Sequence, residues 1–326
     1  MSRNLSIRRG TRSARLGVEC LECRRLLSGK PPAQPTIQEI PDTSNPGEAE
    51  LLITGTKKND GIIIHDDGTN LPGNISVSLN NGTNFTSVNA ISVVEVATGT
   101  GKDNVLYELD GDLEPKIERD VIVGSSAKSG GGTVQFTANI AGKILAESEL
   151  LILGAADQTK TTTMTVNDSG TIDGELSTGL FAPTVGKSTK AGPERYFFSS
   201  TAEISAGGNL ATGILGTKKN DTADIEYSGK NNGEIDVNEM GNSGSDQLTA
   251  NINMSAVSSG TVGTSSDKAI VSGAGHDLLT FRIRRGTDST STTGINADIT
   301  GSSRKDKLVH TGNVIAATSG SDTVVS

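Results

Sequence analysis

A short apolar strand that ends in glycine, followed by a polar turn and a second apolar segment, recurs along most of the chain. If the glycine that ends each strand is taken as a marker, the repeats from Gly99 to Gly301 are spaced by 25 to 32 residues, about 29 on average. Gly55 precedes this series by 44 residues, which fits one unit that carries an insertion. A period of roughly 20 to 50 residues is typical of repeat architectures, in which each unit packs only against its neighbours.

Within each unit the apolar residues alternate with polar ones, as in NVLYEL and TVQFTANI, which predicts strands rather than helices. Two or three short strands in about 29 residues fit one coil of a parallel β-helix. We therefore predict an all-β chain folded as an elongated right-handed parallel β-helix. Eight segments show the pattern clearly: 51–64, 93–109, 120–136, 150–166, 213–227, 241–254, 269–283 and 297–310. Segment 183–198 is a weaker ninth copy.

Composition supports a narrow core. Hydrophobic residues make up 33% of the chain, and only 9 of 326 residues are aromatic, so large side chains are too few to fill a wide core and are expected to be largely superfluous. One alternative fold is a pair of tandem β-sandwich domains. In that arrangement the identical GTKKND segments at 55–60 and 216–221 would mark equivalent strands.

Three regions are expected along the chain. Residues 1–30 carry eight basic and two acidic residues and are typical of a targeting segment. Residues 31–50 hold five of the nine prolines and predict an extended linker. Residues 51–326 form the predicted solenoid. Because the sequence stops within a repeat, we expect its C-terminal end to be truncated, or to support end-to-end self-association.

Charge limits the partners. Beyond residue 30 the chain has 21 basic and 36 acidic residues, so it offers no basic surface for nucleic acid. The longest apolar run, LLILGAA at 150–156, is far shorter than the approximately 20 residues needed to span a membrane.

The segment VECLECRRLLS at 18–28 resembles the LEPR-XLL segment found at the N-terminus of planctomycete surface and secreted proteins. Leu21, Glu22 and Arg24 match that pattern, as do Leu26 and Leu27, while Cys23 stands where proline is usual. The resemblance implies a secreted or cell-surface protein, with an envelope or extracellular matrix component as partner.

Metal-binding and redox signatures outside the glycine turns are weak. Cys20 and Cys23 are the only cysteines, and His65, His276 and His310 are scattered, so the sequence does not predict a zinc site. We expect His65 and His276 to be solvated turn residues.

The glycine turns resemble the hemolysin-type (RTX) calcium-binding nonapeptide, as in SGAGHDLL at 272–279 and NSGSDQL at 242–248. In that family, turn carbonyls and an aspartate carboxylate bind Ca²⁺ between neighbouring turns. The resemblance therefore implies calcium as a cofactor. The candidate ligands are Asp103, Asp246, Asp277 and Asp322, with Asp60 and Asp221 in the looser GTKKND form.

This sequence departs from the RTX pattern because each copy is solitary and because lysine intrudes at Lys58, Lys102, Lys219 and Lys305. Aspartates stacked about 4.8 Å apart would repel by about 3 kcal/mol per pair at an effective dielectric near 20. Calcium or the adjacent lysines could neutralise such a ladder. Alternatively, each aspartate closes its turn by hydrogen bonds to the backbone.

The function predicted is an exported, non-enzymatic structural or adhesive module at the cell surface, with a calcium-stabilised solenoid as one form of it. The alternative is a polysaccharide lyase or hydrolase, because parallel β-helices often carry such enzymes. Alternation places Arg282 and Arg284 on the same side of one strand, but the absence of tryptophan leaves few platforms for sugar rings.

Overall fold

The structure is a computed structural model. It describes residues 34–41, 49–71, 73–79, 81–88, 91–125, 132–155, 161–181, 192–255, 258–262, 270–271, 274–285, 297–300, 306–311, 314–317 and 323–325. The named elements within these residues are all β-strands. No helix found in them is long and apolar enough to cross a membrane.

The strands form two long sheets and one short sheet. Sheet 1 runs in the order β1 (Thr36–Pro41), β2 (Ala49–Thr54), β6 (Ile91–Thr98), β8 (Glu118–Ser125), β11 (Glu149–Ala155), β14 (Glu175–Phe181), β17 (Asn209–Leu215), β19 (Glu234–Met240), β22 (Ile270–Val271), β24 (Ala297–Thr300) and β26 (Val314–Ala317), with β21 (Thr261–Val262) also paired to β19. Sheet 2 runs in the order β27 (Thr323–Val325), β25 (Lys307–Thr311), β23 (Leu278–Arg285), β20 (Gln247–Met254), β18 (Thr222–Tyr227), β15 (Glu194–Ser200), β12 (Thr161–Asp168), β9 (Thr133–Ile140), β7 (Lys102–Leu109), β3 (Gly61–Asp66), β4 (Ile75–Ser78) and β5 (Thr86–Val88). Sheet 3 consists of β10 (Lys143–Ile144), β13 (Thr171–Ile172) and β16 (Glu203–Ile204).

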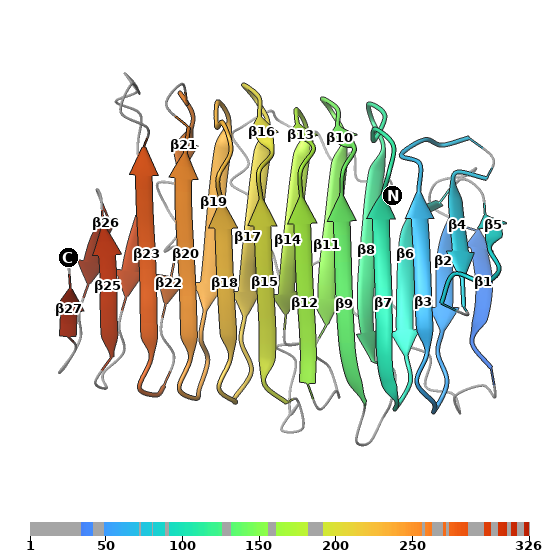
Figure 1. Ribbon diagram of the computed structural model, residues 1–326, viewed down its shortest axis with the longest axis horizontal. Helices are drawn as coiled ribbons and strands as arrows, with labels where there is room; N and C mark the ends of the chain where they lie inside the picture. The colour runs from blue at the N-terminus through green and yellow to red at the C-terminus, as the bar shows by residue number, and fades with distance from the viewer. Residues whose placement is uncertain are drawn as a thin grey trace, which may run out of the picture.

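The chain winds from sheet 1 to sheet 2 and back, and every coil adds one strand in parallel to each long sheet, as in β8–β11–β14 and β9–β12–β15. In Figure 1 the strands of sheet 2 run upward in front and those of sheet 1 run downward behind, while the coils advance from right to left. This path is a right-handed parallel β-helix, the hand that parallel crossovers strongly prefer. The prediction of the fold is confirmed, and the alternative of two β-sandwiches is wrong because neighbouring coils pair in parallel.

The coil length also agrees with the predicted period. Equivalent acidic residues of successive coils are 25 to 31 residues apart from Glu194 to Asp306, but 43 residues apart from Asp60 to Asp103. The longer coil contains the antiparallel strands β4 and β5, which are the predicted insertion. Each long sheet has ten successive positions for parallel strands, with β21 and β22 sharing one position beside β19 in sheet 1. The described residues therefore form ten coils rather than the nine repeats recognised in the sequence.

The N-terminal edges of both long sheets are covered by antiparallel strands. β1 pairs with β2 in sheet 1, and β4 pairs with β3 in sheet 2. Because β1 lies within the predicted linker 31–50, the folded part of the chain starts earlier than the sequence indicated. Antiparallel covers of this kind hide the unpaired backbone groups of an edge strand. Residues 1–30, the predicted targeting segment, lie outside the described residues.

The core is a set of side-chain columns that run along the helix axis. One column in sheet 2 carries Ile62, Val105, Phe136, Met164 and Tyr196 in successive register. All five are at most 2% exposed. Contrary to the expectation from composition, the aromatic residues are not superfluous here, since six of the nine lie in the core cluster: Tyr107, Phe136, Tyr196, Phe198, Tyr227 and Phe281.

Glycine is required where the turns of successive coils touch. A Cβ atom on Gly99 would lie 1.2 Å from the carbonyl oxygen of Thr56, and one on Gly275 would lie 1.4 Å from that of Gly244. Gly101 and Gly244 similarly lie against the carbonyl oxygens of Lys58 and Lys219. The turns with glycine and the GTKKND turns therefore stack on one another at the same corner of neighbouring coils.

Candidate functional site

The aspartates predicted from the glycine turns form one column at the corner where sheet 1 passes into sheet 2. Asp60 and Asp103 stack at the N-terminal end, and Asp221, Asp246 and Asp277 stack further along. Each side chain points into the core, on the same face as the first buried hydrophobic residue of its strand and immediately before it in the alternation of inward-facing residues. Asp322 lies outside the described residues.

Two further acidic residues complete the column, and the sequence analysis missed both. Glu194 precedes Asp221 in the column, and Asp306 follows Asp277. The sequence before Asp306 has a lysine and lacks the second glycine of the nonapeptide, so its motif is degenerate. Glu194 is recognisable only from the alternation of apolar and polar residues in ERYFFSS. Between the two groups, Val134 and Thr162 occupy the same register position.

Each aspartate of the column after Asp60 accepts a hydrogen bond from the backbone N–H of the acidic residue in the preceding coil. The N···Oδ1 distances are 2.9 Å for Asp60 to Asp103, 2.8 Å for Glu194 to Asp221 and 2.8 Å for Asp221 to Asp246. The same bond continues to Asp277 at 2.9 Å and to Asp306 at 3.0 Å. The carboxylates therefore supply acceptors for backbone donors that the corner buries.

The two GTKKND segments form the same turn. Thr56 donates its backbone N–H and its hydroxyl to Asp60, and Thr217 does so to Asp221. Lys58 and Lys219 donate their backbone N–H groups to these threonine hydroxyls at 2.9 and 3.1 Å. Identical sequence thus gives identical local structure at equivalent places of two coils, about half the rod apart.

Burial controls the charge of the column. Asp103, Asp221 and Asp246 are 1 to 2% exposed. Burial raises the pKa of Asp103 to about 6 and, with the charges of Asp221 and Asp277, the pKa of Asp246 to about 7. Burial and the nearby Asp221 carboxylate hold the pKa of Glu194 well above its usual range. Protonation of some members therefore relieves the repulsion that stacked carboxylates would otherwise create.

This geometry agrees best with the alternative in which aspartate closes the turn. Lys58, Lys102 and Lys219 are exposed, and no ion pair joins them to the column within the described residues. A calcium ion would have to compete with backbone N–H groups for the Oδ1 atoms. Oδ2 of Asp246 has no hydrogen-bond partner among the described residues, and calcium binding at the column stays a prediction.

A second buried charged group links the first three coils. Arg119 and Asp66 are both fully buried, and Arg119 Nε lies 2.8 Å from Asp66 Oδ2. Tyr107 donates its hydroxyl to the same carboxylate at 2.9 Å, and Gly68 donates its backbone N–H to Oδ1 at 2.9 Å. Burial raises the pKa of Asp66, and the charge of Arg119 opposes that rise. This network is a structural ion pair inside the core.

The structure corrects the interpretation of His65. It lies in strand β3 on the outer face of sheet 2, where its Nδ1 is 3.1 Å from Oε2 of Glu108 and 3.2 Å from Oδ2 of Asp110. The sequence could not show this contact, because the long first coil separates the histidine from its carboxylates. His276 is exposed in a turn, as predicted.

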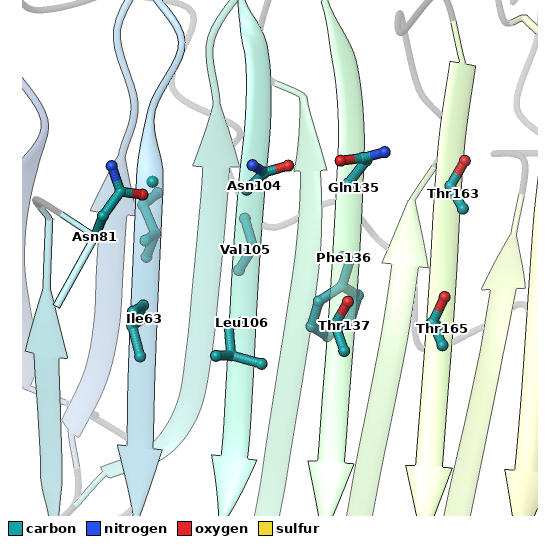
Figure 2. A pocket seen from close by; sticks show the side chains of 12 residues that line it. Ile63, Asn81, Asn104, Val105, Leu106, Gln135, Phe136, Thr137, Thr163 and Thr165 are labelled. Carbon is teal, nitrogen blue, oxygen red and sulfur yellow. The ribbon is translucent and has the colours of Figure 1, made fainter.

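The same outer face carries a shallow groove of about 460 Å³ near the N-terminal end. Figure 2 shows two rows of side chains that cross neighbouring strands there. The first row is Asn81, Asn104, Gln135 and Thr163, and the second is Ile63, Leu106, Thr137 and Thr165. Further along this face, Arg282 and Arg284 line a second groove together, as their alternation predicted.

Comparison with known proteins finds no family model, no curated protein and no solved structure that matches the chain.

Proposed function

We propose that this chain is an exported structural or adhesive module, a rod at the cell surface whose partner is a component of the envelope or extracellular matrix. The observation that carries the proposal is that the turn aspartates bind the backbone of neighbouring coils. They are buried and bond the backbone of the neighbouring coil, so they serve assembly of the rod. A rod of ten coils spaced about 4.8 Å apart extends about 45 Å.

The outer face of sheet 2 supports an adhesive role. Parallel pairing places Gln135 beside Thr163, and Thr137 beside Thr165, in straight rows. Asn139 and Asn167 continue this polar surface and bond each other at 3.0 Å. Amide and hydroxyl groups at fixed spacing on rigid strands suit a hydroxyl-rich polymer such as a glycan.

Location is the first test. Antibodies against the folded chain, used for immunogold labelling of the source organism, are expected to mark the cell envelope or the material outside it. Labelling confined to the cytoplasm would contradict the proposal.

Adhesion is tested with the full chain and isolated envelopes in a sedimentation assay. We expect the wild type to sediment with the envelopes, and the double variant Thr137→Arg/Thr165→Arg to stay in solution because it breaks the rows of sheet 2. Thr171→Arg on sheet 3 is the matched control and should bind as the wild type does. Absence of binding by the wild type would remove the adhesive role and leave only the structural one.

A polysaccharide lyase or hydrolase is the second candidate. The observation in its favour is that Glu108 and Asp110 lie on the same outer face as the groove of Figure 2. Release of reducing ends or unsaturated sugars from a panel of acidic and neutral polysaccharides, abolished by Glu108→Gln, would establish it. No release by the wild type would favour the structural proposal.

A further inference from the structure

His65, Glu108 and Asp110 bring three metal-ligating atoms together on rigid backbone. His65 in β3 lies directly opposite Glu108 in the parallel register with β7, and Asp110 follows the end of β7. The histidine Nδ1 and the two carboxylate oxygens lie within 4.8 Å of one another. None of these residues takes part in the aspartate column or in the buried Arg119 network.

The spacing of these atoms matches a coordination shell. Metal bonds to histidine nitrogen and carboxylate oxygen are about 2.0–2.2 Å long, so two ligands at tetrahedral or octahedral angles are about 3.0–3.4 Å apart. The observed Nδ1···O distances of 3.1 and 3.2 Å fall in this range. The two carboxylate oxygens also lie within 4.8 Å of each other, so adjustment of the Glu108 and Asp110 side chains alone would let one ion contact the nitrogen and both oxygens.

The donor set selects the ion. Calcium and magnesium prefer oxygen ligands alone, whereas an imidazole with carboxylates suits Zn²⁺ and its neighbours. The histidine also distinguishes this cluster from an ordinary acidic patch, because it adds a nitrogen donor between the carboxylates. Asp110 is 64% exposed, so solvent can complete the coordination.

Neighbouring side chains hold the ligands in place. The ring of Phe85, in the segment between β4 and β5, lies 5.0 Å from that of His65, at 44° to it. Asn139 Nδ2 lies 3.5 Å from Oε1 of Glu108, which leaves Oε2 for the ion. Outer-shell contacts of this kind orient metal ligands.

We propose that His65, Glu108 and Asp110 bind one Zn²⁺ ion that joins the first two coils on the outer face of sheet 2. The ion replaces the direct contacts of Nδ1 with the two carboxylates and neutralises their charge. Because the ligands come from β3 and from the end of β7, bound zinc also resists separation of these strands.

The test uses the full chain carrying Cys20→Ser and Cys23→Ser, so that the cysteine pair cannot bind zinc. After treatment with chelator, titration calorimetry with Zn²⁺ is expected to give one equivalent bound and an increase in the thermal unfolding midpoint. His65→Ala should abolish both effects, and Asn139→Ala should weaken binding by about 10- to 100-fold. Circular dichroism at low temperature checks that the variants keep the β signal.

Glu226→Gln is the matched control, because Glu226 is exposed on the outer face of sheet 2 and stands beside Asn251 as Glu108 stands beside Asn139. It should bind zinc as the parent does. Absence of zinc binding by the parent would overturn the proposal, and so would binding that survives His65→Ala. Binding of Ca²⁺ but not Zn²⁺, lost in His65→Ala, would overturn the choice of ion.

Discussion

At the scale of single residues, the corner column shows how a carboxylate can be useful inside an apolar core. Asp246 accepts the backbone N–H of Asp221 and donates its own to Asp277, so one residue links three coils. A buried donor without a partner costs more than a hydrogen bond contributes net, which explains why an acceptor is retained there despite burial of its charge.

Asp246 separates the effect of the acceptor from the effect of the charge. We expect Asp246→Ala to lower the free energy of unfolding by about 1–3 kcal/mol, because it leaves the N–H of Asp221 unpaired. Asp246→Asn keeps an acceptor without charge and should be at least as stable as the wild type at pH 8. Urea unfolding measures both, with Glu226→Ala as a surface control that changes stability by less than about 0.5 kcal/mol. Equal losses in the alanine and asparagine variants would contradict the assigned role.

The raised pKa values predict the direction of pH dependence. In the folded chain the pKa of Asp103 is about 6 and that of Asp246 about 7. Glu239 in β19 is fully buried, and burial raises its pKa well above its usual range. Between their ordinary values near 4 and these raised values, the folded state binds more protons than the unfolded state. The free energy of unfolding is therefore highest near pH 4 and falls as pH rises to about 7.

Thermal unfolding followed by circular dichroism tests this, and the midpoint is expected to be higher at pH 5 than at pH 8. The double variant Asp246→Asn/Glu239→Gln should show a smaller difference between these two values, because it removes two of the titrating groups. A midpoint that rises from pH 5 to pH 8 in the wild type would contradict the assignment.

At the scale of elements, the ion pair of Arg119 and Asp66 ties β8 to β3 across the interior of the first coils. Removal of one partner from a buried pair leaves an uncompensated charge, which typically costs about 3–5 kcal/mol. We expect Arg119→Met to destabilise by about that amount in urea unfolding at neutral pH. The double variant Arg119→Met/Asp66→Asn should recover a large part of the loss, since no buried charge remains. A double variant as unstable as the single one would show that packing of Arg119, not its charge, is what counts.

How far the sequence predicts the structure differs between strands and contacts. Alternation in NVLYEL or TVQFTANI is local, so the strands, their inward faces and the period could be recognised. The stacking of Asp60 and Asp103 could also be predicted from the sequence, because equivalent turns of successive coils must stack. Glu194 was missed because a glutamate stands there in place of the aspartate of the motif, in the weak repeat at 183–198. Its column position becomes visible only through the hydrogen bond that its backbone N–H donates to Asp221.

Contacts across coils of unequal length could not be predicted. His65 meets Glu108 only because β4 and β5 occupy the additional residues of the long coil, so the register resumes after them. Likewise, the alternation of IIIHD indicates that Asp66 points inward, but nothing in the sequence identifies Arg119 as its partner. Such pairs depend on which residues of different coils the fold brings side by side, and the local sequence pattern does not determine this.

At the scale of the whole molecule, one continuous interior runs along the rod between the sheets. The column of carboxylates and the columns of apolar side chains run along the same axis, so the coils that carry a column carboxylate are fixed to their neighbours by both. We propose that the turn aspartates act as internal acceptors for backbone N–H groups and do not depend on calcium.

Calcium dependence is measured most directly by thermal unfolding of the full chain at pH 7, followed by the β signal of circular dichroism. The chain is first freed of metal by chelator and then titrated with calcium into the millimolar range. We predict the same midpoint throughout, because backbone donors already occupy the Oδ1 atoms of the column. A midpoint that rises steadily with calcium would mean that the ion binds the folded state preferentially, and would contradict the calcium-independent role of the aspartates.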